Sequence, residues 1–396
     1  MNVNWTKSTL GDSLSLIRNG VNCKQDKSGI GDKISRIETI ASAQVNLERV
    51  GFSILTKEQK EKYKLQQGDI LFSHINSTVH VGKTAYIDDD YPLYHGINLL
   101  LIRAADNIDP GYLELFLRGL FWSGYWERIC KKSVNQASVN QTDIKKTPFQ
   151  YPPLEEQKQI VAKLDQCFEA IDKAKANATK NLENAKELFQ SKLNDIFSQK
   201  GEGWVEQKLG DVCKLIDSLH KTPSYIKEGG FPMIRVTDIK DGFVNFKNAR
   251  RVNKDVYGEF SKRHIASIGD LVLSRVGSYG IPAIVETDTL FCLGQNTVFL
   301  IPLINTYWIY YFLISPNSKQ QMDKSASGVA QPTVSLKAIK QINIPIPSLE
   351  EQKQIVKILD SLRRQIQSLE SKYQQELNSL EELKKSILQK AFEGEL

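Results

Sequence analysis

The sequence is poor in the residues that build disulfide-stapled or metal-centred proteins. Its five cysteines are scattered along 396 residues, odd in number and free of any C-x-x-C pair. This pattern indicates neither a disulfide framework nor a zinc site. No apolar run approaches the length of a membrane span, and the opening stretch MNVNWTKSTLGD lacks the apolar core of a signal peptide. We therefore expect a soluble, cytoplasmic protein without a membrane partner.

Motifs that organise an active site are equally scarce. The tripeptide Gly82-Lys83-Thr84 resembles the end of a phosphate-binding loop, but Ser77 stands where that loop needs glycine. Neither a glycine-rich dinucleotide motif nor the Asn-Pro-Pro-aromatic motif of an amino-methyltransferase occurs, and the acidic run 88–90 is more typical of a solvated turn. Three histidines lie close together without organised carboxylates and are better interpreted as loop or core residues: His74, His80 and His95. We expect no catalytic residue, no metal and no cofactor bound by this chain.

One octamer, LEEQKQIV, occurs twice, at Leu154–Val161 and at Leu349–Val356. A proline-bearing extended run precedes each copy, and each copy opens a segment of some forty residues without proline or glycine. Ser348 precedes Glu351 by the three residues that allow a hydroxyl and a carboxylate to cap a helix, whereas the first copy has Pro153 there. The sequence therefore predicts two long helices in a chain that is built twice.

Each predicted helix carries a stripe of apolar residues at steps of three and four, as in a coiled coil. Helices of about 40 residues would run roughly 60 Å at about 1.5 Å per residue. Burying both stripes within one chain favours packing of the helices against each other; two amphipathic helices on separate cores are the alternative. The stripes are Val161, Leu164, Phe168, Ile171, Lys175, Ala178, Leu182, Ala185, Phe189, Lys192 and Ile196, and then Ile355, Leu359, Leu362, Ile366, Leu369, Tyr373, Glu376, Leu380, Leu383 and Ile387.

The duplication extends into the segments that precede the helices. At an offset of 199 residues Trp5 matches Trp204, and Arg36 in ISRI matches Arg235 in MIRV. The motif Gly-Asp followed by two apolar residues recurs at 68–71 and 269–272. Because the offset drifts between 195 and 201, small insertions are expected in loops. Further matched pairs are Asn98 with Asn296, Gln136 with Gln331, Val139 with Val334 and Ile144 with Ile339.

The segments before the helices are expected to be β-rich domains with a few helices, because their short apolar runs are bounded by Gly, Asn, Ser or Asp. A helix is expected over 110–132 in the first domain and over 306–324 in the second. We predict an α+β fold with a first domain at 1–150, a first long helix at 151–200, a second domain at 201–345 and a second long helix at 346–396. Duplicated halves tend to pack about an approximate two-fold axis, a symmetry that duplex DNA also offers.

The net charge of +6 is unevenly distributed. Residues 154–199 hold eight acids and seven bases, and residues 349–393 hold eight of each, so the helices carry −1 and the rest of the chain +7. A basic surplus outside the helices favours a polyanionic partner for the globular domains. A merely soluble basic surface is the alternative that charge alone leaves open.

The combination of motifs resembles one family. A Pro-x-Leu-Glu-Glu-Gln-x-x-Ile helix start occurs twice, each time after a domain that opens with a Trp and Leu-Gly-Asp and contains a central Gly-Asp motif and a late Gln. This arrangement is similar to that of the DNA-specificity subunit of type I restriction-modification systems, over essentially the whole chain. Departures are small: one extra residue separates Trp5 from Leu10, and Ala137 stands where the second half has Pro332.

The resemblance implies a non-catalytic subunit whose two target-recognition domains each read one half of a split, asymmetric sequence in double-stranded DNA. It implies that the long helices pair antiparallel, with pseudo-two-fold symmetry, and dock two methyltransferase subunits, which bind S-adenosylmethionine. Restriction subunits join the full complex. A four-residue deletion after Ala178, about 6 Å of helix, is then expected to change the preferred gap between half-sites by one or two base pairs.

Candidate DNA-contacting residues are polar groups in loops that differ between the halves while the flanking motifs match. Arginine and amides are common readers of base edges, and hydroxyls reach bases or phosphates. For each residue a local capping or turn hydrogen bond is the competing interpretation. The predicted contacts are Arg36, His74, Asn76, Ser77, Gln136 and Ser138 in the first domain, and Arg235, Ser274, Arg275, Ser278, Tyr279, Gln331 and Thr333 in the second.

Two other classes of protein remain open on the sequence alone. A coiled-coil interaction scaffold would lack salt-dependent affinity for DNA. An enzyme with an unrecognised centre would bind S-adenosylmethionine or cleave DNA as an isolated chain. The target sequence of each domain does not follow from the residues.

Overall fold

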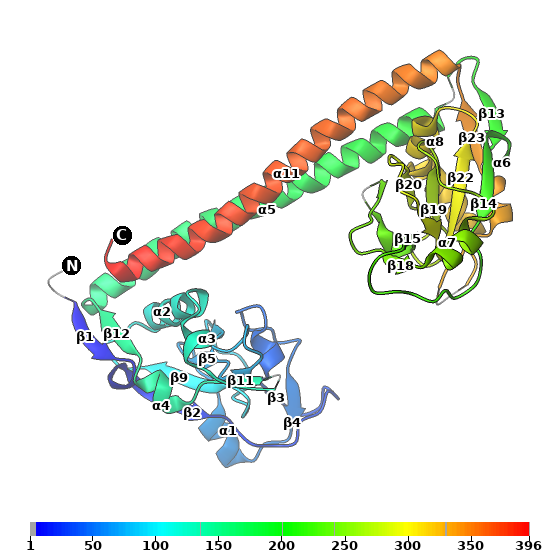
Figure 1. Cartoon of the computed structure of the whole chain (residues 1–396). Helices are drawn as coiled ribbons and strands as arrows, with labels where there is room; N and C mark the ends of the chain where they lie inside the picture. The colour runs from blue at the N-terminus through cyan, green and yellow to red at the C-terminus, as the bar shows by residue number, and fades with distance from the viewer. Residues whose placement is uncertain (1–4, 135, 200, 241, 329–330, 396) are drawn as a thin grey trace. The chain divides into compact units, whose positions relative to one another are not determined.

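The computed structural model describes residues 5–134, 136–199, 201–240, 242–328 and 331–395. The chain divides into two compact units, one of residues 1–178 with 375–396 and one of residues 179–374 (Figure 1). Each unit contains a globular domain and a segment of both long helices. The fold is α+β, as the sequence predicts. None of the helices in the described part of the chain is long and apolar enough to cross a membrane.

The first domain is built from short strands, and the order in its central sheet is β2-β9-β5-β7. Smaller sheets have the orders β4-β3-β8, β10-β11-β6 and β1-β12. The strands are β1 (Thr6–Thr9), β2 (Leu14–Asn19), β3 (Asp32–Ile34), β4 (Gly51–Ser53), β5 (Ile70–Phe72), β6 (Ile75–Asn76), β7 (Thr84–Tyr86), β8 (Leu93–Tyr94), β9 (Leu100–Ala104), β10 (Lys131–Ser133), β11 (Gln136–Ser138) and β12 (Pro148–Tyr151). The helices are η1 (Gly11–Ser13), η2 (Ile37–Ile40), α1 (Lys57–Tyr63), α2 (Pro110–Trp122), α3 (Tyr125–Ile129) and α4 (Gln141–Lys145).

The second domain repeats this plan, with a central sheet of order β14-β22-β19-β20-β17-β16 and smaller sheets β18-β15-β21 and β13-β23. Its strands are β13 (Val205–Lys208), β14 (Cys213–Asp217), β15 (Phe231–Ile234), β16 (Ile239–Lys240), β17 (Phe243–Val244), β18 (Arg250–Val252), β19 (Leu271–Ser274), β20 (Pro282–Ile284), β21 (Cys292–Leu293), β22 (Thr297–Pro302) and β23 (Asn343–Ile346). Its helices are α6 (Leu209–Val212), η3 (Val236–Asp238), α7 (Lys254–Ser261), α8 (Thr306–Leu313), α9 (Pro316–Ser325) and α10 (Leu336–Lys340).

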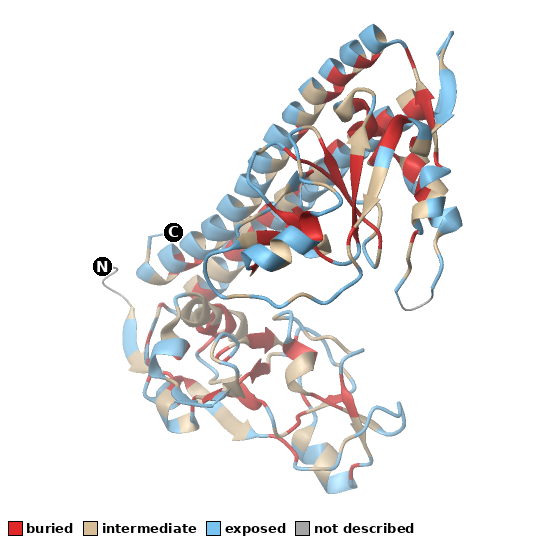
Figure 2. Cartoon of the chain, turned by 45° about the vertical axis from the view of Figure 1, so that its right-hand side comes forward, coloured by how far each residue is buried: buried red, intermediate tan, exposed pale blue. Residues whose placement is uncertain are grey.

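Both central sheets are covered on both faces, which explains their continuous apolar runs. In β5, Ile70 and Phe72 belong to one core cluster, whereas Leu71 between them belongs to another. The same alternation in β19 sends Leu271 and Leu273 to one cluster and Val272 to a second. Figure 2 shows buried residues concentrated on the strands of each domain.

The helix expected after each central sheet is interrupted in the structure, so that part of the prediction was wrong. In the first domain α2 ends at Trp122, and Gly124, with φ of 71°, starts the separate helix α3. In the second domain α8 ends at Leu313, and Ser315 caps α9 with Pro316 at its first turn. Glycine in the left-handed region and proline at a helix start both punctuate a helix.

The two long helices are α5 (Leu154–Ser198) and α11 (Leu349–Glu393), each of 45 residues and each beginning at the octamer. They run antiparallel within each unit. In the first unit Lys384 Nζ lies 2.8 Å from Asp172 Oδ1, and Lys175 pairs with Glu381. In the second unit Leu193 and Phe197 of α5 share a core cluster with Val356 and Leu359 of α11. The helices therefore pack on each other rather than on separate cores.

The predicted stripe of the first helix is buried or partly buried as far as Phe189, and Ile196 also packs against the second-domain core, but the fully buried positions near the helix end are shifted by one residue. Lys192 is exposed, and Leu193 and Phe197 are buried in its place; toward the end of the second helix Leu383 is exposed and Leu388 is buried. A straight helix drifts relative to a strict seven-residue repeat. The shifted residues also meet the domain, because Phe197 contacts the Trp308 ring of α8.

The octamer joins each helix to the start of its domain. The indole Nε1 of Trp5 donates to Glu156 Oε1 at 3.1 Å, and Trp204 Nε1 donates to Glu351 Oε1 at 2.9 Å. The next residue of each copy is a buried glutamine whose amide donates to a proline carbonyl: Gln157 to Pro152 at 2.9 Å and Gln352 to Pro347 at 3.0 Å. Ser348 caps the second helix, as predicted, because its Oγ accepts from Glu351 N at 3.3 Å. Two of the bonds that each octamer makes are therefore shared by both copies, which explains why the Glu and the Gln recur.

The repeated Gly-Asp motif forms the turn that leads into the central strand. Gly68 and Gly269 have φ of 93° and 92°, a region that favours glycine. The carboxylate of Asp69 accepts from Gln66 N at 2.9 Å, and that of Asp270 accepts from Ser267 N at 2.8 Å. The motif is thus a framework feature of both domains.

Candidate nucleic-acid interface

The two predicted arginines occupy the same position in the two domains. Each stands at the start of a 3-10 helix just after a strand, Arg36 after β3 and Arg235 after β15. Arg36 Nε lies 2.9 Å from Glu38 Oε1, and Arg235 Nε lies 3.1 Å from Asp238 Oδ2. Both side chains remain 28% exposed. Each guanidinium is therefore held by a neighbouring carboxylate and keeps other donors for a ligand.

In the first domain the structure brings the two predicted loops together. Strand β6 pairs with β11, so that Asn76 lies opposite Ala137 and Ser138 lies opposite Ile75. Gln136 is exposed at the start of β11, and Ser77 is exposed just after β6. The Asn76 amide donates to Ser73 Oγ at 3.0 Å and accepts from Ser77 N at 2.8 Å. These polar groups therefore lie on adjacent strands of one small sheet, with Gln136 and Ser138 on one face and Asn76 on the other.

The second domain joins its two loops in the same register. Val276 forms a bridge with Thr333, which corresponds to the pair Ile75 and Ser138 at the offsets of the repeat. Gln331 and Ser278 are exposed, and Thr333 is half-buried. The Tyr279 hydroxyl donates to Asp323 Oδ1 at 2.6 Å, and Lys319 Nζ lies 3.8 Å from the centre of the Tyr279 ring. The loop after β19 is thus fixed to α9.

Two predicted contact residues are buried and hold the loops in place. Ser274 Oγ donates to Ser278 O at 2.7 Å and accepts from Ile281 N at 2.9 Å, which closes the turn after β19. Arg275 is 9% exposed, and its Nη1 donates to Asp217 Oδ1 at 2.6 Å. For Ser274 these bonds favour the competing interpretation of a local turn hydrogen bond, whereas Arg275 is held by an ion pair to a residue 58 positions away.

His74 is the first-domain counterpart of Arg275. Val139 N donates to the His74 carbonyl, and Val334 N donates to the Arg275 carbonyl. The partner of each side chain comes from the same strand position, since Asn19 lies opposite Leu100 and Asp217 lies opposite Val298. His74 Nε2 is 3.5 Å from Asn19 Nδ2, and burial lowers the pKa of His74. A neutral pair in the first domain thus replaces an ion pair in the second.

Sequence reasoning missed two residues beside Arg235. Tyr225 and Arg250 line, together with Arg235, Gln295 and Asn296, a cavity of about 320 Å³ in the second domain. The guanidinium carbon of Arg250 lies 4.7 Å from the centre of the Tyr225 ring. An aromatic residue and an arginine on one polar cavity are a usual signal of base or phosphate recognition. The offset of 199 aligns Arg250 with Gly51. A residue-by-residue comparison of the two halves of the chain would therefore have shown that an arginine in the second half replaces a glycine in the first.

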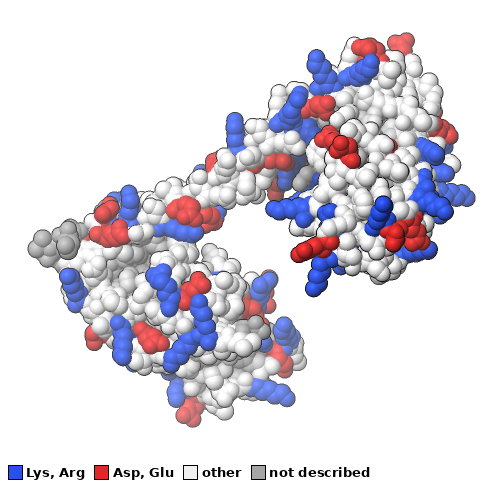
Figure 3. Space-filling view, viewed as in Figure 1, with Lys and Arg blue, Asp and Glu red and all other residues white. Residues whose placement is uncertain are grey.

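Lys and Arg gather over the end of the second domain that carries β18 and α7 (Figure 3). Residues 247–263 hold six basic and two acidic residues. Such a stretch attracts phosphates without reading sequence. It lies beside the Arg235 cavity, because Arg250 belongs to both.

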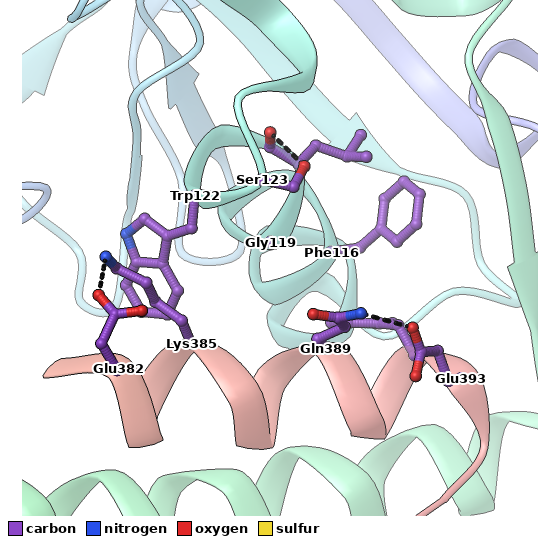
Figure 4. A pocket seen from close by; sticks show the side chains of 10 residues that line it. Phe116, Gly119, Trp122, Ser123, Glu382, Lys385, Gln389 and Glu393 are labelled. Atoms are coloured by element: carbon purple, nitrogen blue, oxygen red, sulfur yellow. Dashed lines mark hydrogen bonds and ion pairs between the residues drawn. The ribbon is translucent and has the colours of Figure 1, made fainter. Parts of the chain in front are cut away.

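A second concave surface lies in the first unit, between α2 and the end of α11. This groove, of about 380 Å³, is lined by Phe116, Leu120 and Trp122 on one side and by Phe392, Gln389 and Lys385 on the other. Figure 4 shows Trp122 beside the Glu382–Lys385 ion pair and Phe116 above Gln389. The groove includes none of the predicted DNA contacts and is more apolar than the Arg235 cavity.

The buried histidine and cysteines outside these surfaces have a structural role. His95 is fully buried, which lowers its pKa to about 4, and its Nε2 lies 3.1 Å from the Leu99 carbonyl. Burial raises the pKa of Cys213 and Cys292 to about 12, so these thiols stay protonated. His80 is an exposed loop residue. Within the described residues, no group of three or more His, Cys, Asp or Glu could hold a metal ion.

Comparisons with known proteins agree on one family. The family model for the type I restriction modification DNA specificity domain matches residues 2–184 and again residues 201–379. A protein of Methanocaldococcus jannaschii assigned as the type I restriction enzyme MjaX specificity subunit is 31% identical, covering 99% of this chain and 93% of its own length. A solved structure on complex assembly and conformational transition of the type I R-M system has the same fold, with a TM-score of 0.77 at 21% identity over 100% of this chain and 99% of that one. The HsdS subunit from Thermoanaerobacter tengcongensis aligns with a TM-score of 0.60, also at 21% identity, over 100% of this chain and 98% of its own.

Proposed function

This chain belongs to the type I restriction-modification DNA specificity family, with two specificity domains, and on that premise we propose that each domain reads one half of a split, asymmetric DNA target. The observation that carries the proposal is the shared register of the two reading patches. The same strand pairs hold both, Ile75 with Ser138 and Val276 with Thr333, yet the side chains around them differ. One scaffold with two sets of polar groups suits two unlike half-sites.

The predicted contacts take two roles in this proposal. Exposed and half-exposed groups face the DNA, and buried groups support them. Ser274 and Arg275, together with His74, belong to the supporting set because their hydrogen bonds are made within the domain. The groups proposed to reach the DNA are Arg36, Asn76, Ser77, Gln136, Ser138, Arg235, Ser278, Tyr279, Gln331 and Thr333.

The paired helices serve as the dock for two methyltransferase subunits in this proposal. Most of their residues are exposed along the described length, and their net charge is close to zero, so they suit a protein partner better than DNA. S-adenosylmethionine would be bound by those methyltransferase subunits, and restriction subunits would join through the same core. The chain itself would be non-catalytic, and work on host and foreign DNA would place it in the cytoplasm.

Adenine methylation mapping tests the proposal directly. The chain is expressed with its cognate methyltransferase subunit, and methylated positions are mapped by long-read sequencing against cells lacking the chain. We expect a new motif of two short, unlike half-sites separated by a fixed gap. A stable complex that adds no methylated motif would contradict the proposal and favour a protein-interaction scaffold.

A further inference from the structure

The printed strand pairs align the Arg235 cavity with its counterpart in the first domain, residue by residue. Met233 lies opposite Arg250, and Ile34 lies opposite Gly51, so Arg250 and Gly51 hold the same position. Bridges join Ile226 to Arg251 and Asp26 to Phe52. The residues just before those bridges, Tyr225 and Gln25, therefore correspond as well. Where the second domain has a tyrosine and an arginine, the first has a glutamine and a glycine.

The two arginines of the second-domain cavity are held in different ways. Arg235 is fixed by Asp238, with Nε to Oδ2 at 3.1 Å and Nη2 to Oδ1 at 3.4 Å, and Asp238 is buried. The Arg250 guanidinium lies over the Tyr225 ring at 4.7 Å, and the Arg250 side chain makes no hydrogen bond or ion pair to any residue that the structure describes. Stacking orients the plane of the Arg250 guanidinium while its N–H donors stay free. A planar donor fork is thus in place and unused.

The chemistry of the cavity selects a flat, acceptor-rich ligand edge. Its polar lining includes both guanidiniums, the Thr237 hydroxyl and the amides of Gln295 and Asn296, and none of the described residues that line it carries a carboxylate. The O6 and N7 atoms of guanine present two acceptors that match an arginine fork. The basic stretch 247–263 beside the cavity supplies separate groups for the phosphates.

We infer that the second-domain cavity reads a guanine, with Arg250 as the bidentate donor and Tyr225 as the positioning residue beneath it. The inference rests on the proposed function and names the base chemistry of one of its two sites. At this position the first domain has Gly51 and Gln25 in place of the arginine and the tyrosine, so it lacks this donor fork. A Cβ on Gly51 would lie 2.4 Å from Gln25 Oε1 and 3.1 Å from Arg36 Cδ, so a side chain there would have to displace those two side chains.

The test uses the full chain with its methyltransferase subunit and maps methylation for Arg250→Ala, Arg250→Lys and a matched control, Lys214→Ala. Lys214 is exposed on β14 and lies outside both the cavity lining and the basic stretch 247–263, and its substitution removes the same charge as Arg250→Ala. The wild-type motif should contain a guanine in one half, and both Arg250 variants should lose discrimination at that base pair alone, by roughly 5- to 150-fold. Lysine keeps the charge but not the planar fork, so Arg250→Lys should behave like Arg250→Ala. The control should keep the motif intact.

A second pair of variants isolates the stacking. Tyr225→Phe keeps the ring and should retain the wild-type motif, whereas Tyr225→Leu should relax the same base pair as the Arg250 variants. If Arg250→Ala lowers methylation of all sites equally and Arg250→Lys restores it, Arg250 contacts a phosphate and the inference is overturned. A split motif that no Arg250 variant changes also overturns it and leaves the proposed function intact. A wild-type chain that directs no split motif overturns the proposed function, and the role of the cavity with it.

Discussion

The first and second domains differ most where their strand pairing is most alike. The pair Asn19 and His74 and the pair Asp217 and Arg275 come from corresponding strand positions, but one is neutral and the other is charged. Gln25 and Gly51 correspond in the same way to Tyr225 and Arg250. A backbone ladder is held by its own hydrogen bonds, so side chains beside it can change without moving it. The comparison teaches that framework and reading surface are separable in this fold.

The paired helices connect the two domains, so shortening them should have the largest effect on methylation of the target. Removing Lys175–Ala178 from α5 and Asn378–Glu381 from α11 deletes antiparallel partners and about 6 Å of helix. We expect methylation of the original target to fall on the order of 100-fold, because one half-site is lost. Methylation should reappear on targets with a gap changed by one or two base pairs, at about 3.4 Å each.

The matched control for this deletion is the double variant Lys175→Ala and Glu381→Ala, which removes an ion pair without changing helix length. It should keep the original gap. An unchanged gap preference in the shortened protein would show that helix length does not set the spacing of the half-sites.

The carboxylates of the two Gly-Asp motifs should contribute unequally to the free energy of unfolding. Asp69 is buried and accepts from Arg103 at 2.6 and 2.9 Å, whereas the side-chain partner of Asp270 is His264. Asp69→Ala should lower the free energy of unfolding by about 2–3 kcal/mol, and Asp270→Ala by about 1–2 kcal/mol. Chemical denaturation measures both, with Asp106→Ala as an exposed control. Equal losses would mean that the arginine pair adds nothing.

In mild acid His95 should destabilise the first domain, whereas the second domain has no histidine at the corresponding position. Burial lowers the His95 pKa to about 4 from 6.5, so the unfolded state binds the proton first and stability falls as the pH drops from about 7 toward 4. The expected loss at pH 5 is about 2 kcal/mol. The second domain has Leu293 at this position, so His95→Leu should remove the part of the acid sensitivity that comes from His95 and leave the contribution of His74, whose pKa burial also lowers. Thermal unfolding of the wild type and the variant at pH 7.5 and 5 checks this, and identical pH dependence would contradict it.

Removing the tryptophan hydrogen bonds should have the smallest effect on the free energy of unfolding, and the loss should be nearly the same in both halves. Trp5→Phe and Trp204→Phe keep an apolar ring but remove the indole donor to Glu156 and Glu351. Each should cost about 1 kcal/mol, the usual value of one hydrogen bond. Denaturant titration of the two variants provides the comparison. A much larger loss for one variant would show that the two joints are not equivalent in energy.

The sequence predicts the parts of this fold that repeat. Two copies of the octamer locate α5 and α11, and matched motifs such as Gly68-Asp69 and Gly269-Asp270 locate the central strands. The apolar stripe predicts that the helices pair, but it does not predict which residues are buried near the domains. Leu193 and Phe197 are buried because they also pack against the second domain, and this contact does not follow from helical periodicity. Likewise, the break between α2 and α3 depends on one glycine in the left-handed region.

The candidate site was less accessible to sequence reasoning. Pairing β6 with β11 required tertiary contacts, although the two loops that it joins were both selected. Arg275 looks like an exposed reader in the sequence, but its ion pair with Asp217, 58 residues away, buries it. Arg250 and Tyr225 were missed because no matched letters flank them; the offset of 199 aligns Arg250 with Gly51, and strand register confirms that pair and adds the pair of Tyr225 with Gln25.

The two bonds that both octamers share make the globular segments exchangeable between the two helices. A segment running from Trp5 to Pro153 ends in the same pair of connections as one running from Trp204 to Pro347: a tryptophan for the glutamate of the octamer, and a proline carbonyl for its glutamine. Either globular segment, or one taken from a relative with the same octamer, could therefore be exchanged at these residues and joined to either long helix. The glutamate and the glutamine of the octamer would form the same two hydrogen bonds with the exchanged segment.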